Sequence, residues 1–166
     1  DSRAAAGAMV LLIRRAQALM EAAGDDGDFD ALCQQLHRYQ ATLRTCFTLE
    51  NFDNLIKNGR MRPIVGTLLR SLGIHIIADA TAEGTIHVAD KARGVGKTYR
   101  AITALMGASK DCTDAEVVIS HCENLEGAMA LKRQILEDLP VKHVDLLSCR
   151  GLTSFYAMEK GLIVGY

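Results

Sequence analysis

The chain has 166 residues, of which 49% are hydrophobic, and a formal net charge of −1. This length and apolar content are typical of one globular domain with an ordinary core, or of one domain with an appendage. No block of like charge offers a surface for nucleic acid, and the absence of Trp argues against base stacking. No apolar run reaches the ~20 residues that span a bilayer, so the sequence does not predict a membrane-spanning protein.

The five cysteines are scattered, and no two of them form a Cys-x-x-Cys pair, so we expect no zinc site. We interpret them as reduced thiols of a cytoplasmic protein. The histidines show no metal-ligand spacing, and we expect neither a metal nor another cofactor. The chain starts at Asp1 without an initiator Met, which is consistent with a fragment of a longer protein.

Two long helices are predicted at the start of the chain. Residues 4–23 have helical periodicity, and the hydroxyl of Ser2 could accept a hydrogen bond from a free N–H group of their first turn. Asp28 can cap a second helix over residues 29–43 in the same way.

Shorter elements follow. Residues 44–49 are β-like, and residues 50–59 predict a helix that ends at Gly59, where a left-handed conformation costs glycine least. Pro63 fits the first turn of a further helix over residues 63–73.

A β-hairpin is predicted over residues 74–93, because two β-rich runs flank the turn residues Ala82, Glu83 and Gly84. A helix is expected after Gly96.

The last third of the chain alternates strands with a helix. Residues 115–120 form a continuous apolar run that is typical of a buried strand, and residues 123–139 form an amphipathic helix that Pro140 stops. Residues 141–149 and 161–166 are β-like. The mixed order predicts an α/β or α+β fold, with a central mixed sheet and helices packed on it.

The stretch KARGVGKTYRAI, residues 91–102, contains Gly-Val-Gly-Lys-Thr, which resembles the end of a nucleotide-binding P-loop. The first glycine of that motif would fall at Lys91, a side chain that cannot easily take a positive φ. The preceding strand alternates apolar and polar residues, whereas a P-loop follows a buried parallel strand. We therefore interpret the stretch as a strand, a Gly-rich turn and a helix N-terminus without a nucleotide.

A basic junction lies between the helix that ends at Gly59 and the helix that starts at Pro63. It places the guanidinium groups of Arg60 and Arg62 beside the free N–H groups of a helix N-terminus, and both favour an anion such as a carboxylate or phosphate. Arg60 could equally cap carbonyl groups of the preceding helix.

His121 leaves a buried strand at the edge of the sheet, where α/β proteins tend to place their sites, although a structural role is open as well. The apolar segments around residues 45–52, 64–72 and 74–80 could form an ordinary core or line a tunnel for an alkyl chain. Burial of an alkyl chain contributes about 0.8 kcal/mol per methylene, so a long tail needs little help from its head group.

Four stretches, taken together and in order, resemble the DegV family of fatty-acid-binding proteins. They are DSRAAAGAMVLLIRRAQALMEAAG, TCFTLENFDNLIKNGRM, LLRSLGIHIIADATAEGTIHVADKARGVGKTYRAI and EVVISHCENLEGAMALKRQI. The resemblance covers almost the whole chain. It implies that residues 44–166 form the lipid-binding C-terminal lobe and that residues 1–43 are helices of an incomplete N-terminal lobe.

The resemblance also implies a carrier that performs no chemistry unaided. A long-chain fatty acid would lie with its tail in an apolar tunnel and its carboxylate between two lobes, and a separate ATP-dependent kinase would convert it to acyl phosphate. By this likeness Ser2 hydrogen-bonds the carboxylate, and Arg60 lies near the head group or its phosphorylated form. The candidate head-group residues are Ser2, Arg60, His121 and Tyr156, and the candidate tail-lining residues are Phe47, Leu55, Ile64, Leu68, Ile76 and Ile119.

The sequence departs from the family pattern in two places. Nothing before Asp1 corresponds to the family's N-terminal lobe, whose Thr/Ser-rich loop also holds the carboxylate. Tyr156 falls roughly where the family has a His in a Gly-rich loop. Two alternatives therefore stay open: an enzyme subunit that acts on a carboxylated or phosphorylated substrate at Arg60 and His121, and an interaction domain with a filled core and no ligand.

Overall fold

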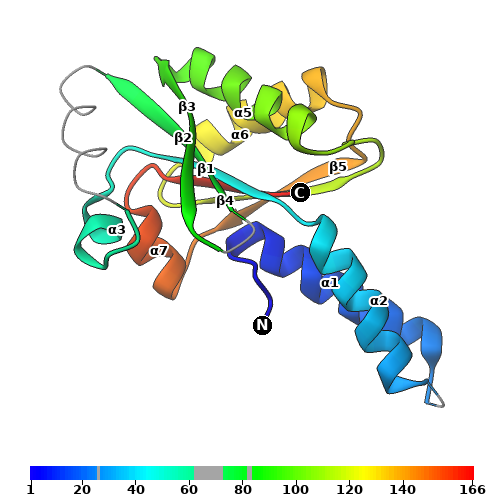
Figure 1. Ribbon diagram of the computed structural model, residues 1–166. Coiled ribbons are helices and arrows are strands. Elements are labelled where there is room, and N and C mark those ends of the chain that lie inside the picture. The colour runs from blue at the N-terminus through cyan, green and yellow to red at the C-terminus, as the bar shows by residue number, and fades with distance from the viewer. Residues whose placement is uncertain (26, 62–72, 82–83) are drawn as a thin grey trace.

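The structure is a computed structural model and describes residues 1–25, 27–61, 73–81 and 84–166. Figure 1 shows a twisted mixed sheet with helices packed on both of its faces. The described helices are α1 Ala6–Ala23, α2 Phe29–Thr42, α3 Asp53–Lys57, α5 Val95–Ser109, α6 Leu125–Asp138 and α7 Gly151–Ala157. The strands are β1 Thr45–Leu49, β2 Ile74–Ala80, β3 Ile86–Arg93, β4 Glu116–His121, β5 His143–Ser148 and β6 Leu162–Gly165. The predicted mixed sheet with packed helices is confirmed.

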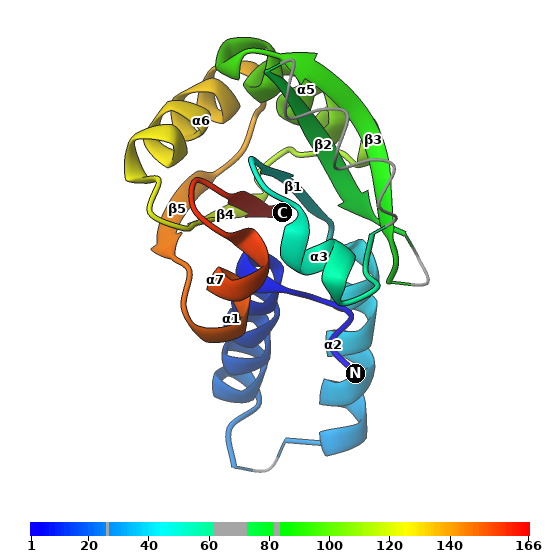
Figure 2. The same cartoon turned by 90° about the vertical axis from the view of Figure 1, so that its left-hand side faces the viewer.

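The strands lie in the order β3-β2-β1-β6-β4-β5, and among these pairs β4 and β5 run parallel whereas the other neighbours are antiparallel. The helices α5 and α6 cover one face, and α1 packs on β4 and β6 from the other face. The helices α3 and α7 lie on the α1 side, and α1 pairs with α2 in a helical hairpin that projects from the sheet (Figures 1 and 2).

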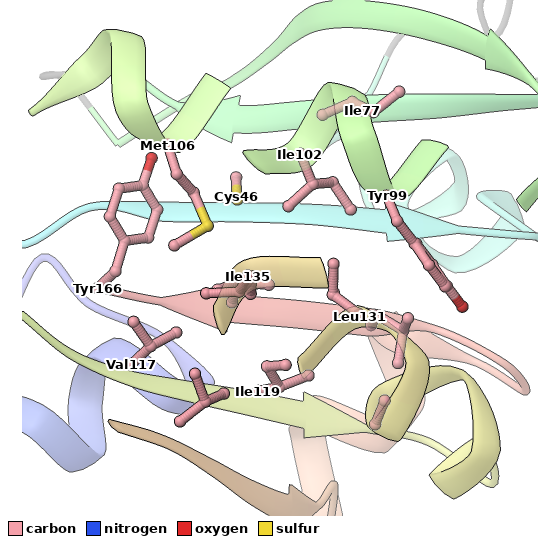
Figure 3. Close-up of a cluster of buried hydrophobic side chains, with 14 of the residues drawn as sticks. Cys46, Ile77, Tyr99, Ile102, Met106, Val117, Ile119, Leu131, Ile135 and Tyr166 are labelled. Carbon is pink, nitrogen blue, oxygen red and sulfur yellow. The ribbon is translucent and has the colours of Figure 1, made fainter. Parts of the chain in front are cut away.

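The central core fills the space between the sheet and the helices α5 and α6 (Figure 3). Its largest fully buried members include Ile77, Ile102, Met106 and Tyr166. The Tyr166 phenol forms a 2.8 Å hydrogen bond with the Ser109 hydroxyl, so its polar end has a partner. Burial raises the pKa of this phenol well above its ordinary value.

The contact between α1 and the sheet depends on two glycines. A Cβ added to Gly165 would overlap the backbone N of Ala8, and a Cβ added to Gly7 would overlap the carbonyl oxygen of Val118. The helix backbone therefore lies directly on β4 and β6, and Ala8 and Leu11 become almost fully buried there. Only residues without a Cβ permit this approach.

Several predicted boundaries are confirmed in detail. The Asp28 carboxylate accepts hydrogen bonds from the backbone N–H groups of Asp30 and Ala31 and caps α2. Gly59 follows α3 with a φ of +68°. The N–H of Gly59 donates to the Ile56 carbonyl and that of Arg60 to the Leu55 carbonyl, which is the Schellman pattern.

The predicted hairpin is confirmed as the antiparallel pair β2 and β3, although its turn residues Ala82 and Glu83 lie outside the described residues. The predicted helix over residues 63–73 lies outside them too, apart from Gly73. Strand β3 is an antiparallel edge strand, as its alternation predicted, whereas a P-loop follows a buried parallel strand.

Three local predictions were wrong or missing. The helix α1 begins at Ala6 behind Ala5, which offers no side-chain cap, and the Ser2 hydroxyl instead contacts Ala4. The helix α5 begins at Val95, one residue before Gly96. The helix α7 was not predicted, because seven residues are too few for a clear helical period.

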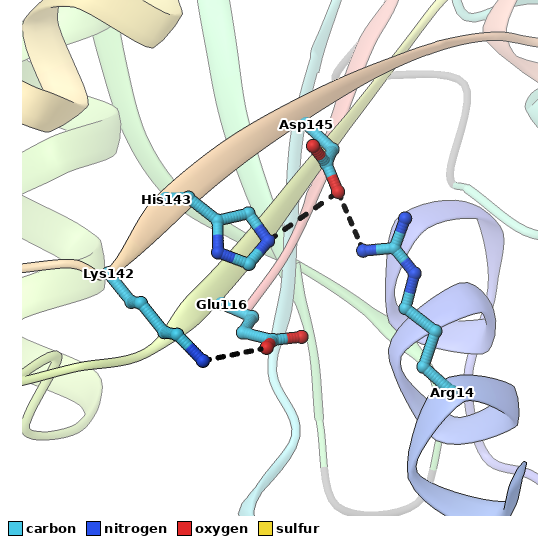
Figure 4. Close-up of polar contacts among 5 residues, drawn as sticks. All are labelled: Arg14, Glu116, Lys142, His143 and Asp145. Carbon is cyan, nitrogen blue, oxygen red and sulfur yellow. Dashed lines mark hydrogen bonds and ion pairs between the residues drawn. The ribbon is translucent and has the colours of Figure 1, made fainter. Parts of the chain in front are cut away.

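A group of charged side chains joins α1 to the parallel strand pair (Figure 4). Arg14 Nη1 lies 2.6 Å from Asp145 Oδ2, His143 lies 3.6 Å from the same carboxylate, and Lys142 lies 3.6 Å from Glu116. The hydrogen bond from Arg14 lowers the pKa of the Asp145 carboxyl, and the surrounding cations lower it further, against a smaller opposing effect of burial.

None of the described helices is both long and apolar enough to cross a lipid bilayer. All five cysteines are free.

We predict that Gly165→Ala will destabilise the fold by about 3 kcal/mol, because the new methyl group must push α1 away from the sheet. Urea unfolding monitored by circular dichroism measures this change. Gly96→Ala is the matched control: its Cβ would meet nothing within 4 Å. Equal stability of both variants would contradict the proposed contact.

We predict a small, pH-dependent loss of stability in Arg14→Gln. The pair is partly exposed, so the free energy of unfolding should fall by only about 0.5 kcal/mol at neutral pH. Because the folded-state pKa of Asp145 is lowered, the contribution is fully present above the carboxyl's unfolded pKa. It disappears as the pH falls through the lowered folded-state pKa.

Urea unfolding of wild type, Arg14→Gln and the exposed control Arg38→Gln over an acid pH series measures this difference. A gap between wild type and Arg14→Gln that widens as the solution becomes more acidic would contradict the assignment.

Candidate ligand-binding site

A second apolar cluster lies on the face of the sheet opposite the central core, beneath α3 and α7; we call it the α3–α7 cluster. Its buried members are Leu49, Phe52, Leu55, Met61, Ile76, Ala78 and Ala157. Partly buried side chains pack against them: Phe47, Ile56, Ile86, Val88, Cys122, Cys149, Tyr156 and Ile163. Figure 2 shows the two short helices α3 and α7 next to each other on this side of the sheet.

The strand register explains why these residues meet. Directly paired residues of neighbouring strands share a face. One such row runs from β3 to β4 through Val88, Ala78, Phe47, Ile163 and Ser120. Its members come from distant parts of the chain, so only the folded sheet makes the apolar surface continuous.

Polar groups lie at two borders of this surface. Ser120 is 5% exposed and brings a buried hydroxyl to the β4 end of the row. On the helical side, Asn54 of α3 donates a 2.7 Å hydrogen bond to the Phe155 carbonyl of α7, which ties the two short helices together. The neighbouring Tyr156 ring packs against the cluster and makes an edge contact with the Phe155 ring.

Two thiols lie together where the parallel strands end. Cys122 follows β4 and Cys149 follows β5, and the N–H of Cys149 donates a 2.7 Å hydrogen bond to the His121 carbonyl. Both side chains pack against the α3–α7 cluster. Burial, and secondarily the neighbouring Cys122, raises the pKa of the Cys149 thiol to about 11. The thiol is therefore neutral near neutral pH and contributes apolar surface.

The structure brings together four of the residues that the sequence suggested. Phe47, Leu55 and Ile76, expected to line a tail, and Tyr156, expected near a head group, all belong to the α3–α7 cluster. Ile64 and Leu68, also expected to line a tail, lie outside the described residues.

Ile119, suggested to line a tail, and His121, suggested near a head group, face the side of the sheet opposite the α3–α7 cluster. Ile119 is fully buried in the central core beneath α5 and α6. His121 lies two residues further along the same strand and pairs with Leu162, another core residue, so it shares that face. Its Nδ1 accepts a 3.4 Å hydrogen bond from the Asn124 backbone N–H. The continuous apolar run of this buried strand concealed its alternation.

Ser2 and Arg60 hold different positions relative to the cluster. Arg60 is exposed and directly precedes Met61, which is buried in the cluster, so Arg60 lies at its border. Ser2 lies in the segment before α1, where the carbonyl of Asp1 accepts a hydrogen bond from Gln40 of α2. The hydroxyl of Ser2 is partly buried and engages only local backbone groups of Ala4 among the described residues.

The sequence analysis missed Ser120 and the thiol pair. Ser120 is a polar residue inside an apolar strand, and this signal is visible in the sequence. It does not distinguish a polar group at a site from an ordinary buried serine. The adjacency of Cys122 and Cys149 depends on the parallel register of β4 and β5, and no local pattern encodes it. In the part of the chain that the structure describes, no three His, Cys, Asp or Glu side chains form a group that could hold a metal ion.

Comparison with known proteins shows which family has this architecture. The model of a family described as "Uncharacterised protein, DegV family" matches residues 1–162. A DegV domain-containing protein of Streptococcus gordonii is 30% identical over 166 residues, which are 100% of this chain and 58% of that protein. One of Streptococcus pyogenes serotype M1 is 32% identical with the same coverage. The chain thus spans a little over half the length of these relatives.

Solved structures show the same similarity. The Fatty Acid Kinase (Fak) B3 protein of Streptococcus pneumoniae, loaded with linoleic acid, superimposes with a TM-score of 0.91 at 30% identity over 100% of this chain and 58% of its own. A DegV family protein of Eubacterium eligens, loaded with heptadecanoic acid, gives a TM-score of 0.91 at 25% identity over 99% of this chain and 58% of its own.

We predict that the Cys149 thiol is alkylated slowly by iodoacetamide in the native protein at about pH 8, and that the rate keeps rising towards the raised pKa of about 11. The reason is that only the thiolate reacts. Peptide mass spectrometry after timed alkylation measures the rate. The control is the same residue in urea, where the thiol is no longer buried. Equal alkylation rates of Cys149 in the native and the urea-denatured protein at about pH 8 would contradict burial of the thiol.

Proposed function

The chain belongs to the DegV family, and from this premise we propose that it is the tail-binding part of a carrier for long-chain fatty acids, with the α3–α7 cluster as the acyl site. The observation that carries the proposal is the continuous apolar surface on one face of the sheet, built from β1, β2, β3 and β6 and bordered by α3 and α7. The fatty acids bound to two structural relatives, linoleic and heptadecanoic acid, have the chemistry that such a surface favours.

The energetics support an acyl chain as the main contact. Each buried methylene contributes about 0.8 kcal/mol, so a chain of long-chain fatty acid length can be held with few polar contacts. The helix pair α3 and α7 is short and is joined by a side-chain hydrogen bond from Asn54. Such small elements can adjust around a ligand at less cost than the sheet beneath them.

The head group is proposed to lie at the border of the cluster. Tyr156 supplies a hydroxyl next to the apolar surface, and Arg60 supplies a cation beside the buried Met61. A guanidinium beside a carboxylate or an acyl phosphate gives a strong charge-assisted hydrogen bond. We also propose Ser2 as a contact of the carboxylate. It would act together with residues from the part by which the relatives are longer than this chain.

The chemical step is proposed to belong to a partner. The name of the Fak B3 relative connects that protein with a fatty acid kinase, and a separate kinase for this carrier is proposed by analogy. An enzyme site formed by Arg60 and His121 loses support, because His121 faces the central core side whereas Arg60 borders the opposite cluster. We also propose that residues 1–43 belong structurally to the N-terminal lobe, although α1 packs on this sheet.

The direct test is organic extraction of the purified full-length protein followed by mass spectrometry, together with uptake of added palmitate and oleate. We expect a fatty acid at close to one equivalent. Absence of any extracted fatty acid, combined with no uptake, would favour the ligand-free interaction domain instead.

We predict that Ile76→Ala and Ile77→Ala will separate binding from stability. Both residues are fully buried on β2, but Ile76 faces the α3–α7 cluster and Ile77 faces the central core. Each truncation should cost about 2–5 kcal/mol of stability. Only Ile76→Ala should also change the relative affinity for palmitate and shorter acyl chains, by about tenfold.

Competition binding with a fluorescent fatty acid, at a temperature where both variants are folded, measures this difference. Equal effects of the two variants on chain-length preference would contradict the placement of the acyl site.

A further inference from the structure

Two cysteines lie next to each other where the parallel strands β4 and β5 end. The strand pairing places His121 beside Ser148, and the next residues along the two strands are Cys122 and Cys149. The 2.7 Å hydrogen bond from the Cys149 N–H to the His121 carbonyl continues the parallel ladder by one step. Cys122 and Cys149 are therefore lateral partners, and both side chains pack against the α3–α7 cluster on the same face of the sheet.

This arrangement suits a disulfide. Neighbouring strands lie about 4.8 Å apart, which falls within the range of about 4.4–6.8 Å between the Cα atoms of disulfide-linked residues. Each cysteine directly follows the last residue of its strand, so a small approach of the two thiols does not require the strands themselves to move. Both thiols are free and partly exposed, so an oxidant can reach them.

The other three cysteines lack this combination of proximity and exposure. Cys33 lies on α2, in the helical hairpin that projects from the sheet (Figure 1). Cys46 and Cys112 both belong to the central core, where Cys46 is completely buried. Burial holds the pKa of the Cys46 thiol well above its ordinary value, so this thiol is both neutral and shielded from an oxidant.

The backbone connects both cysteines to α7. Arg150 alone separates Cys149 from the first residue of α7. The N–H of Cys122 donates a 3.0 Å hydrogen bond to the Gly161 carbonyl, and its carbonyl accepts a 2.8 Å hydrogen bond from the Lys160 N–H, so Cys122 is tied to the segment after α7. A bond between the two sulfur atoms would close a short loop around α7 and restrict how far this seven-residue helix moves from the cluster.

We propose that Cys122 and Cys149 form a reversible disulfide in the presence of a peroxide, and that this bond holds α7 against the α3–α7 cluster. First, the Cys122 sulfur attacks a peroxide oxygen: the O–O bond breaks, water leaves with the thiol proton, and a sulfenic acid remains. The Cys149 sulfur then attacks the Cys122 sulfur: an S–S bond forms, the S–O bond breaks, and the hydroxyl leaves with the Cys149 proton as a second water. Two thiols are oxidised, and one hydrogen peroxide is reduced.

Burial explains why Cys149 acts second. It raises the pKa of the Cys149 thiol to about 11, and a neutral thiol reacts slowly with peroxide from solution. The adjacent Cys122 sulfenic acid, by contrast, is held beside Cys149 at a high effective concentration, which offsets the small thiolate fraction.

The first experiment treats the purified full-length protein with hydrogen peroxide, blocks the remaining thiols and maps the peptides by mass spectrometry. Digestion with trypsin and Glu-C together separates Cys112 from Cys122 by cleavage after Glu116. We expect peptide 117–123 to be linked to peptide 143–150, and dithiothreitol to remove the link. Absence of this link overturns the proposal, and so does a link of either cysteine to another cysteine or to a second molecule in its place.

Hydrogen–deuterium exchange tests the effect on α7. The α7 amides of the oxidised protein should exchange at least about threefold more slowly than those of the reduced protein, whereas the amides of α5, on the other face of the sheet, should not change. Peroxide also converts methionine to its sulfoxide, and Met158 directly follows α7. Dithiothreitol separates the two effects, because it opens the disulfide and leaves the sulfoxide. Slowing that survives dithiothreitol, or linked protein without slowing, overturns the proposed restriction of α7.

Matched variants assign the effect to the two thiols. Cys122→Ala and Cys149→Ala should each lose both the peptide link and the slower exchange of α7. Cys33→Ala should keep both, because Cys33 lies in the helical hairpin. Slower exchange of α7 after peroxide in Cys149→Ala would assign the effect to another group and overturn the proposal.

The consequence for the ligand rests on the proposed carrier function. If α7 covers the acyl site, the oxidised protein should release bound palmitate at least about threefold more slowly, and dithiothreitol should restore the rate. Equal release from the linked and the reduced protein would overturn control of the acyl site by this thiol pair. A protein that binds no palmitate in either state contradicts the carrier function alone, because the peptide link and the exchange of α7 are measured without a fatty acid.

Discussion

The alternation of side chains along β1 determines which residues meet on each face of the sheet. Phe47 points into the α3–α7 cluster, and the next residue, Thr48, points to the α5/α6 side. Strand β1 lies inside the sheet between β2 and β6. Its pairing therefore determines which residues of these two strands share a face with Phe47 and which share a face with Thr48. One face therefore becomes an almost wholly apolar surface, and the other carries the packed central core. A shift of register by one residue would exchange these environments.

The glycine contact between α1 and the sheet restricts the apolar face from one side. Gly7 and Gly165 let the helix backbone lie on β4 and β6, so that end of the face is covered by a long, well-packed helix. Among the residues that the structure describes, the helices over the remainder of the face are α3 and α7, which have five and seven residues. The strength of the cover thus differs along the same surface.

Local signals made much of the fold predictable from the sequence. The carboxylate of Asp28, the positive φ of Gly59 and the alternating hairpin strands act through neighbouring residues, and each prediction is confirmed. The site was only partly predictable, since its residues meet through strand pairing. Phe47, Leu55 and Ile76 could be proposed from apolar content, but Ile119 has the same content and faces the opposite side. A strand buried on both faces carries no alternation that distinguishes them, and the adjacency of Cys122 and Cys149 requires the register itself.

The position of His121 bears on whether it can act together with the residues of the α3–α7 cluster. A general base must reach the reacting group, and it must be oriented by a partner that leaves its reactive nitrogen available. Here Nδ1 accepts the Asn124 N–H, so a neutral ring carries its proton on Nε2 and offers no lone pair there. The strand also directs the ring to the side of Leu162, with the whole sheet between it and Tyr156 at the α3–α7 cluster. The described residues thus place the cation of Arg60 and an apolar cluster on one side of the sheet and the imidazole on the other. That separation argues against a single site formed by Arg60 and His121.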